Sequence, residues 1–265
     1  MNVTDIEWCD MTWNPVTGCL HDCPYCYAKE RTNRFQGYEL DGGITTYNPY
    51  DGPALLREPL ITSSKHGKRR RAPFPFGFDP TMHTYRLDEP MKKKSSKDIF
   101  VCSMSDLFGE WVHDEWIEMV FNACRKAPQH RYLFLTKNPK RYTRLMVEDK
   151  LPLGENIWYG ATVTDGKSLK EAENLYCLSP FKDANIFMSV EPLLGEVRFG
   201  LMPDLVIVGA ETGSRKKQPP PEMNGWVQKI YDACRNADVP IFMKDSLAPH
   251  WDGELIKDLP WRYGL

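Results

Sequence analysis

The sequence lacks the long apolar runs of a membrane protein. No stretch reaches the roughly 18 consecutive apolar residues that a membrane-spanning helix needs. The opening residues, MNVTDIEW, also lack the basic and apolar regions of a secretory signal. Both absences predict a cytoplasmic protein without a membrane segment.

A large excess of charge of one sign is absent as well. The formal net charge is −2, so the chain as a whole is no polycation that attracts nucleic acid through its overall charge. Two local basic runs nevertheless stand out, Lys65–Arg71 and Lys92–Lys97. With the aromatic residues nearby, they predict a surface that binds a nucleotide or DNA; the alternative is a solvated face.

A second C-x₂-C pair is also missing, although the chain has eight cysteines. Three of them, Cys19, Cys23 and Cys26, form a C-x₃-C-x₂-C run. In a reducing compartment such a cluster indicates a metal site more than a disulfide framework. The other cysteines are scattered, mostly in apolar segments, and are typical of buried thiols: Cys9, Cys102, Cys124, Cys177 and Cys234.

Three cysteines do not complete a structural zinc site, which needs four tetrahedral ligands. The nearby candidates for a fourth ligand are His21 and Cys9, and His21 lies between two of the cysteines, where a short loop has difficulty turning it inward. A 4Fe-4S cluster is the better interpretation. Three thiolates would then hold three irons and leave the fourth open to a molecule that chelates through an amine and a carboxylate, such as S-adenosylmethionine.

From residue 97 onward, short apolar runs alternate with amphipathic segments. This alternation predicts an α/β fold with parallel strands and right-handed crossovers. Together with a first strand near Thr12–Thr17, the runs are too few for a complete barrel. We predict an incomplete (β/α) barrel of about six or seven parallel strands, with an open doubly wound sheet as the alternative. The runs are Ile99–Cys102, Tyr132–Leu135, Ile157–Gly160, Ile186–Val190, Leu205–Gly209 and Val239–Met243.

We expect a single domain over residues 1–265. Residues 36–96 interrupt the alternation, because they are rich in glycine, proline and aromatic residues and show no strong period. We expect this segment to be an irregular insertion that follows the first helix and lies near the barrel mouth.

Polar side chains follow the predicted strands at their carboxyl ends. In a parallel α/β fold these ends share one edge, and that edge carries the functional site. We therefore predict a polar-rimmed mouth that binds a cofactor. Its candidate residues are Ser103, Ser105, Asp106, Thr136, Lys137, Thr162, Ser189, Glu191 and Glu211.

The C-x₃-C-x₂-C run follows the first predicted strand and has an aromatic residue, Tyr25, before its last cysteine. In these features it resembles the defining motif of the radical S-adenosylmethionine (radical SAM) superfamily. The resemblance implies an incomplete α/β barrel and a 4Fe-4S cluster on Cys19, Cys23 and Cys26. It also implies reductive cleavage of S-adenosylmethionine to a 5′-deoxyadenosyl radical, which abstracts hydrogen from a substrate.

The rest of the chain resembles a phage-associated protein family of largely unassigned function. The matching phrases cover nearly the whole chain and include IEWCDMTWNPVTGC (6–19), IFVCSMSDLFGE (99–110) and FMSVEPLLG (187–195). A phage protein would work in the cytoplasm of a bacterial host. Many members of that family have a longer gap between their first and second cysteines, whereas this sequence has the tight superfamily spacing.

The superfamily resemblance also implies residue roles. Tyr25 would contact the adenine; the alternative is that it only packs the loop. The usual Gly-Gly-Glu-like stretch for the methionine amine is missing after the second strand. Ser103, Ser105 and Asp106 stand there, and they would either accept from the ammonium or cap the next helix. Lys137 would bind the cofactor carboxylate or an anionic substrate; the alternative is a lysine at a strand end that is simply solvated.

Glu191 would accept the ribose hydroxyls of the cofactor, or it would simply begin a loop. The indoles of Trp8, Trp13 and Trp158 would pack around the cluster and keep water from a radical, or they would be ordinary core residues.

The predicted function is radical SAM chemistry that modifies or rearranges a nucleobase or nucleotide in DNA, as an isomerase, lyase or transferase. An electron donor such as flavodoxin or ferredoxin would be needed. A base-damage repair lyase of the same superfamily and a non-catalytic metal-binding adaptor are the alternatives. The sequence leaves the substrate and the oligomeric state open.

Overall fold

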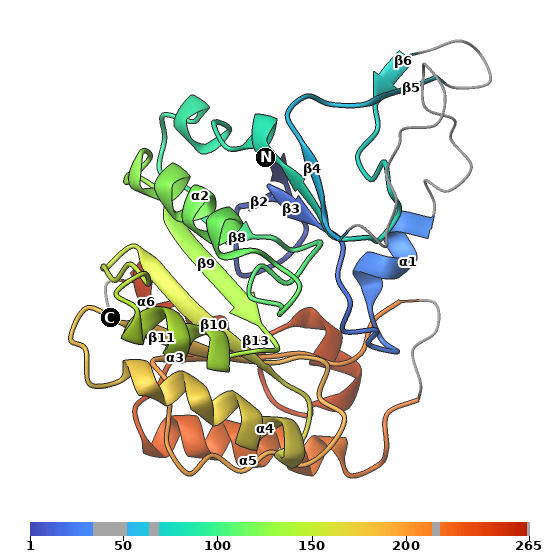
Figure 1. The fold of residues 1–265 in the computed structure, drawn as a ribbon. Coiled ribbons are helices and arrows are strands. Elements are labelled where there is room, and N and C mark those ends of the chain that lie inside the picture. Colours follow the sequence, from blue (N-terminus) through green and yellow to red (C-terminus); the bar gives the residue numbers. More distant parts are fainter. Residues whose placement is uncertain (34–51, 64–68, 214–217, 264–265) are drawn as a thin grey trace.

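The computed structural model describes residues 1–33, 52–63, 69–213 and 218–263 (Figure 1). Within these residues, eight strands form one sheet in the order β1-β2-β8-β9-β10-β11-β12-β13. The strands are β1 (Asn2–Val3), β2 (Met11–Trp13), β8 (Asp98–Val101), β9 (Arg131–Thr136), β10 (Ile157–Val163), β11 (Asn185–Val190), β12 (Leu205–Val208) and β13 (Ile241–Met243).

All strands of this sheet except β1 run parallel to their neighbours, and they follow one another in chain order. Strand β1 is antiparallel to β2 and forms one edge. The prediction of an α/β fold with a largely parallel sheet is therefore confirmed. In the described part of the chain, β1 and β13 are not paired with each other, so no closed barrel is seen.

The predicted first strand, Thr12–Thr17, is divided into two. Strand β2 ends at Trp13, and β3 (Val16–Thr17) joins a different, three-stranded sheet of order β3-β7-β4. Asn14 and Pro15 separate the two strands. The break follows from proline chemistry, because Pro15 has no N–H to donate to a ladder.

Four helices lie along one face of the large sheet (Figure 1): α2 (Asp114–Arg125), α3 (Lys140–Val147), α4 (Gly166–Ala172) and α5 (Met223–Asn236). Alternate strand residues point toward these helices, including Val101, Phe134 and Tyr159, and form the larger core with them. Helix α4 begins with a capping box in which the Asp165 side chain accepts from backbone N–H groups and Ser168 reaches back. The 3₁₀ segment η4 (Glu173–Leu178) extends α4.

The opposite face of the sheet carries a smaller apolar cluster that includes Trp8, Phe100, Trp158 and Phe187. The register places Gly160 beside Phe187, and a Cβ at Gly160 would come within 2.3 Å of that ring. Glycine is needed there because the aromatic side chain fills the space of a side chain on the neighbouring strand.

The C-terminal segment closes the amino-terminal end of this inner face. Trp261, on α6 (Pro260–Tyr263), packs on Trp158 with ring centroids 4.8 Å apart and donates to Asp98 over 2.9 Å. The inner face is therefore filled at this end, and a cavity can form only toward the carboxyl ends of the strands.

The described part of the insertion at residues 36–96 contains short strands that the sequence analysis does not predict. Its described part contains β4 (Ala54–Leu56), β5 (Ile61–Ser63), β6 (Arg69–Arg71) and β7 (Thr81–His83), followed by the 3₁₀ segments η2 (Thr84–Arg86) and η3 (Pro90–Lys92). Strand β7 pairs with both β3 and β4, whereas β5 and β6 form a separate two-stranded antiparallel sheet at the upper right of Figure 1. Period-based reasoning missed these strands because each has only three residues.

None of the described helices has the length and apolar character needed to cross a membrane.

Candidate functional site

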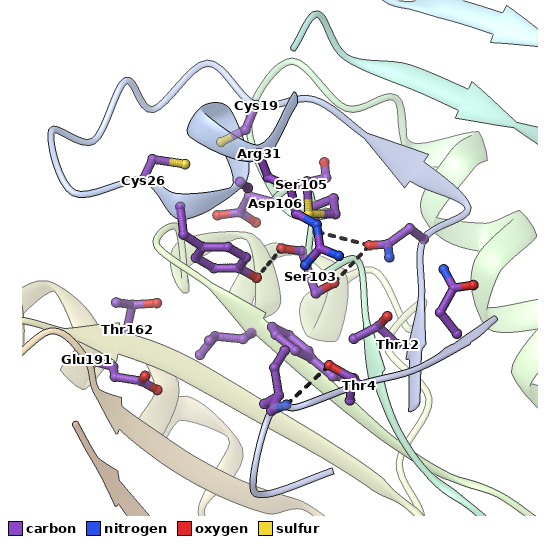
Figure 2. A pocket seen from close by; sticks show the side chains of 18 of the residues that line it. Thr4, Thr12, Cys19, Cys26, Arg31, Ser103, Ser105, Asp106, Thr162 and Glu191 are labelled. Atoms are coloured by element: carbon purple, nitrogen blue, oxygen red, sulfur yellow. Dashed lines mark hydrogen bonds between the residues drawn. The ribbon is translucent and has the colours of Figure 1, made fainter. Parts of the chain in front are cut away.

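A cavity of about 760 Å³ lies on the inner face of the sheet, at the carboxyl ends of the parallel strands (Figure 2). Every residue that the sequence analysis predicts as a cluster ligand or a cofactor-binding residue lines this cavity. These residues are Cys19, Cys23, Tyr25, Cys26, Ser103, Ser105, Asp106, Thr136, Lys137, Thr162, Ser189, Glu191 and Glu211. The structure therefore brings together segments that are almost 200 residues apart in the chain, although their roles stay predictions.

Strand register explains part of this convergence. Thr162 on β10 is paired with Ser189 on β11, and Ser189 is paired with Ile207 on β12. Thr162 and Ser189 are buried and line the cavity, and Glu191, two residues after Ser189 and just beyond the end of β11, lines it as well. Side chains two residues apart share a face of a sheet, so these positions form rows on the cavity wall.

The loop that carries Cys19, Cys23 and Cys26, called the cysteine loop below, is held by backbone contacts at its start. Gly18 has a φ of +85°, and a Cβ there would lie 2.2 Å from the carbonyl oxygen of Asp79. Its N–H donates to Met104 O over 2.9 Å, and the N–H of Cys19 donates to Phe78 O over 3.1 Å. Only glycine suits this position. The first residues of the loop are therefore fixed between the insertion, through Phe78 and Asp79, and the segment after β8, through Met104.

The three cysteines of the loop are unpaired and half-buried. The Cys26 N–H donates to Cys23 O over 3.1 Å, and the Lys29 N–H, in the first turn of α1 (Tyr27–Asn33), donates to Cys26 Sγ over 3.3 Å. Burial raises the pKa of the Cys19 thiol to about 12. Without a metal, Cys19 is therefore a neutral thiol at pH 7.

The donor set fits an iron–sulfur cluster in its chemistry. Thiolates are the ligands of such clusters, and Cys19, Cys23 and Cys26 reach one cavity from one short loop. Among the described residues, no group of three or more His, Cys, Asp or Glu side chains is arranged to hold a metal ion. The cluster assignment thus depends on the cysteine spacing and on the shared cavity.

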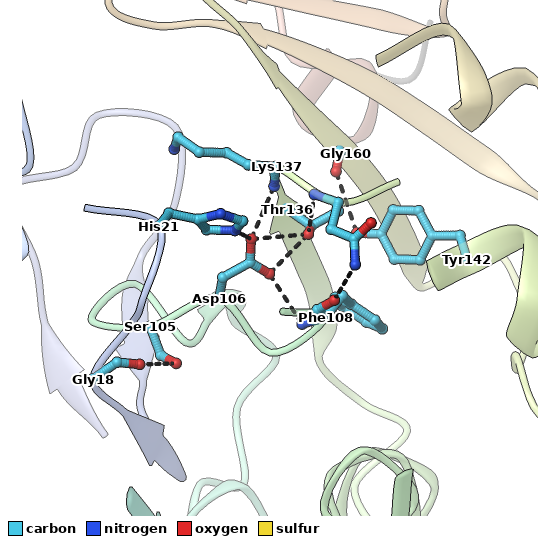
Figure 3. Close-up of polar contacts among 10 residues, drawn as sticks. Gly18, His21, Ser105, Asp106, Phe108, Thr136, Lys137, Tyr142 and Gly160 are labelled. Carbon is cyan, nitrogen blue, oxygen red and sulfur yellow. Dashed lines mark hydrogen bonds and ion pairs between the residues drawn. The ribbon is translucent and has the colours of Figure 1, made fainter. Parts of the chain in front are cut away.

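Asp106 is the centre of a buried hydrogen-bond network beside the cysteine loop (Figure 3). Its Oδ2 accepts from the Lys137 N–H over 2.9 Å and lies 2.8 Å from His21 Nε2. Its Oδ1 accepts from Thr136 Oγ1 over 2.7 Å and from the Phe108 N–H over 3.0 Å. Asp106 therefore joins the cysteine loop, the loop after β8 and the end of β9.

These contacts set the charge of the carboxyl group. Burial alone would raise the pKa of Asp106, but hydrogen bonds and charge from His21, together with the donors of Lys137 and Thr136, hold it below its ordinary value. Asp106 is therefore an anionic anchor with both oxygens occupied by protein donors.

The two serines predicted as ammonium acceptors also make structural contacts. Ser105 Oγ donates to Gly18 O over 2.7 Å. Ser103 Oγ donates to Asn14 Oδ1 over 3.3 Å, and the Ser103 carbonyl oxygen accepts from Tyr27 Oη over 2.6 Å. The segment after β8 thus fastens both ends of the cysteine loop, so a positioning role for these residues has direct geometric support.

Tyr25 lies between the cysteines and the end of β9. Burial and the nearby Cys23 raise the pKa of its hydroxyl group above the ordinary value, and Lys137 Nζ is 5.8 Å from the centre of its ring. Lys137 lines the cavity with Tyr25, so it can bring a positive charge to an anionic group near the aromatic ring.

Glu191 forms a half-buried ion pair with Lys244, which follows β13. Gly209 lies between their strands, and a Cβ there would lie 2.8 Å from Glu191 Cγ and 3.0 Å from Lys244 Cδ. Glycine leaves room for the pair. Lys244 also lines the cavity, where it orients the carboxylate that the sequence analysis assigned to ribose hydroxyls.

A family model described as "Protein of unknown function (DUF5131)" matches residues 3–253. The chain belongs to the DUF5131 family. The matched region includes the cysteine loop and every strand of the parallel sheet. No curated protein and no solved structure matches the chain. Because the family description names no reaction, the resemblance to radical SAM enzymes stays a prediction.

The cavity of this DUF5131 protein also has lining residues that the sequence analysis did not place in the site, among them Thr12, Asn14, Arg31, Arg71 and Arg86. Thr12 lies on β2 and Asn14 follows it, Arg31 lies on α1, and Arg71 and Arg86 belong to the insertion. These segments meet at the cavity only because the insertion folds back onto the start of the chain. Of the three tryptophans expected near the cluster, Trp8 lines the cavity. Trp13 and Trp158 do not line it: Trp13 packs in the larger core, and Trp158 packs in the smaller apolar cluster, to which Trp8 also belongs.

The two basic runs differ in their position relative to the cavity. Lys65 and Lys68 lie outside the described residues. Strand β6 carries the three exposed arginines Arg69–Arg71, and Arg71 lines the cavity. The described Lys92–Lys97 run does not line it, and Lys92 is paired with Asp88 over 2.6 Å. The first run is thus the one that can act at the site.

Proposed function

We propose that this DUF5131 protein is a radical SAM enzyme, with a 4Fe-4S cluster on Cys19, Cys23 and Cys26, that modifies or rearranges a nucleobase or nucleotide. We also propose that its sheet is an incomplete barrel. The chain-order parallel strands, with helices on one face and the cavity on the other, support that description.

One observation carries the proposal. The three motif cysteines and all the polar strand-end residues selected from the sequence line a single cavity. The cavity volume of about 760 Å³ lies within the range of small-molecule sites, roughly 300–1,000 Å³. It therefore has room for a nucleoside-sized cofactor and a substrate group.

Cys19, Cys23 and Cys26 would hold the cluster, which would supply the electron for reductive cleavage of S-adenosylmethionine to methionine and a 5′-deoxyadenosyl radical. The chain's own residues would orient the reactants. Asp106 and Ser105 hold the cysteine loop in place. Tyr25 offers a ring for adenine beside Lys137, and Glu191, held by Lys244, offers acceptors for ribose hydroxyls.

The inner face beneath these residues is aromatic. Trp8 and Phe100 are buried with ring centroids 4.7 Å apart, and both line the cavity. Such a floor would limit the access of water to a radical.

The cluster is tested by anaerobic reconstitution of the full chain with iron and sulfide. We expect about four irons per chain and a broad visible absorption band that dithionite bleaches. Cys19→Ser, Cys23→Ser and Cys26→Ser should each lower the iron content strongly. Cys177→Ser is the matched control, because Cys177 is also a half-buried free thiol but lies on η4, away from the cavity.

Catalysis is tested by adding S-adenosylmethionine and dithionite, or a reduced flavodoxin or ferredoxin, to the reconstituted protein. We expect 5′-deoxyadenosine, measured by mass spectrometry, from the unaltered chain and from Cys177→Ser. A fully loaded cluster that yields none would overturn the enzyme proposal and favour a non-catalytic metal-binding adaptor.

A further inference from the structure

One part of the cavity lies away from the predicted cofactor residues. In Figure 2, Thr4 and Thr12 are on the opposite side of the cavity from Cys26 and Glu191. We call this part the distal subsite and define it by Trp8, Thr12, Asn14, Arg31, Arg71 and Phe74. Trp8 also belongs to the aromatic floor described above, and Arg31 lies on α1 after the cysteine loop, but no residue of the distal subsite is proposed to hold the cluster, the adenine or the ribose.

The floor of the distal subsite has a buried donor without an acceptor. Trp8 is 2% exposed, and its Nε1 has no hydrogen-bond partner among the described residues. A buried N–H group that lacks a partner costs stability. Trp8 lines the cavity. We expect a bound ligand to bring an acceptor atom to Nε1, which would remove this cost.

Asn14 adds a second donor with a fixed direction. Its Oδ1 accepts from the Met104 N–H over 2.9 Å and from Ser103 Oγ over 3.3 Å. An N–H donor must face the oxygen of the amide, so the Met104 contact fixes which atom is Nδ2. Within the described residues, Nδ2 donates no hydrogen bond, so it can donate one to a ligand in the cavity.

Positive charge is the third property of the distal subsite. Arg31 and Arg71 are exposed and line the cavity, and no hydrogen bond or ion pair of either guanidinium is found among the described residues. Arg86, which also lines the cavity, has a structural role, because its guanidinium donates to Asn14 O over 2.9 Å and to Pro73 O over 3.1 Å and so joins two segments of the chain. Its charge has no carboxylate partner in the described part of the chain.

These properties together describe a ligand with acceptor atoms, negative charge and a flat apolar ring. Guanidinium groups match phosphate oxygens, and the indole and phenyl rings of Trp8 and Phe74 match the face of a heterocycle. We propose that the distal subsite binds the nucleobase and phosphate of a nucleotide, either free or as one unit of a single strand. This inference names the substrate class of the function proposed above and rests on it.

Binding is measured by isothermal titration calorimetry on the full chain, before and after cluster reconstitution. The probes are the four deoxynucleoside 5′-monophosphates, the corresponding nucleosides and a mixed-sequence single-stranded 12-mer. We expect at least one monophosphate to bind at least tenfold more tightly than its nucleoside. Tighter binding of the 12-mer than of all monophosphates identifies a strand as the source, and equal or weaker binding identifies a free nucleotide.

Trp8→Phe keeps an aromatic ring and removes the N–H donor. Losing one hydrogen bond should weaken nucleotide binding by about five- to tenfold. Trp158→Phe is the matched control, because Trp158 Nε1 is also buried without a partner but Trp158 does not line the cavity. Equal weakening in both variants would overturn the assignment.

Two further variants keep the test valid if Trp8→Phe folds poorly. Asn14→Asp keeps the oxygen that faces Met104 and replaces the donor with negative charge, so it should abolish monophosphate binding. Arg71→Ala should weaken binding of the monophosphates about tenfold, whereas Arg57→Ala, another exposed insertion arginine outside the cavity lining, should not.

The two proposals fail in different ways. If 5′-deoxyadenosine forms but no nucleotide or 12-mer binds below millimolar concentration, the distal subsite is wrong and the radical SAM proposal stands. If the monophosphates bind with the expected variant effects but no 5′-deoxyadenosine forms, the nucleotide subsite stands and the reaction is wrong.

Discussion

Replacing Asp106 by asparagine should destabilise the protein far more than the near-identity of the two side chains suggests. Asp106 is 5% exposed and accepts hydrogen bonds from His21, Phe108, Thr136 and Lys137. Asparagine keeps one acceptor oxygen and places an NH₂ group where the other oxygen was. The new NH₂ group would then point at a backbone N–H group, and because both are donors, neither could form a hydrogen bond there.

The magnitude follows from the contacts at Oδ2. This oxygen accepts from the Lys137 N–H over 2.9 Å and from His21 over 2.8 Å. Each hydrogen bond to a charged acceptor contributes about 1.5–3 kcal/mol. The His21 contact can form again with the other imidazole tautomer, but the Lys137 donor is left buried and unpaired. We expect the free energy of unfolding to fall by about 2–4 kcal/mol.

The assay is urea denaturation of the metal-free chain at pH 7, followed by circular dichroism. Asp165→Asn is the control, because Asp165 is also a carboxylate after a parallel strand and also accepts from backbone N–H groups. Asparagine caps helices as well as aspartate does, so this variant should change stability by less than about 1 kcal/mol. An equal loss in both variants, or a loss below about 1 kcal/mol for Asp106→Asn, would refute the reasoning.

Three other perturbations test the geometry of the site, each by the same unfolding assay. Gly18→Ala should lower the free energy of unfolding by more than about 2 kcal/mol, since φ is +85° and the added Cβ clashes with backbone; Gly225→Ala, in open space on α5, should not destabilise. Gly209→Ala should cost about 1–3 kcal/mol by displacing Glu191. Burial lowers the pKa of His83 from 6.5 to about 2, so the unfolded chain binds the extra proton. The contribution of His83 to the free energy of unfolding should be constant above pH 6.5 and fall below it by up to about 1.4 kcal/mol per pH unit, and His83→Gln should remove this part of the slope.

The parallel sheet could be predicted because its signals are local. Each strand from β8 to β13 is a short apolar run buried on both faces, and each is followed by polar residues. Such runs identify strands without knowledge of their partners. The convergence of Ser103, Thr136, Thr162 and Ser189 on one cavity then follows from parallel pairing in chain order.

The other wall of the cavity could not be predicted, since its residues meet through long-range pairing. Strand β3 has two residues and β7 has three, too few to show a period. Arg71 and Asn14 reach the cavity because the insertion folds back onto the residues before Cys19. The cysteine spacing suggests a role for His21 only as a zinc ligand. Its hydrogen bond with Asp106 could not be predicted, because neither segment carries a sequence signal for the other.

The pairing of β3 with β7 has a consequence for the order of folding. Thr17 Oγ1 hydrogen-bonds with His83 over 2.8 Å across 66 residues of chain, and Ser105 closes on Gly18 across 87. The cysteine loop can therefore reach its final shape only after the chain has been synthesised to Ser105 and beyond. Closing such long loops is slow compared with forming a helix. During synthesis, the thiols of Cys19, Cys23 and Cys26 would thus remain in an unformed loop, and loading of the proposed cluster would belong to a late stage of folding.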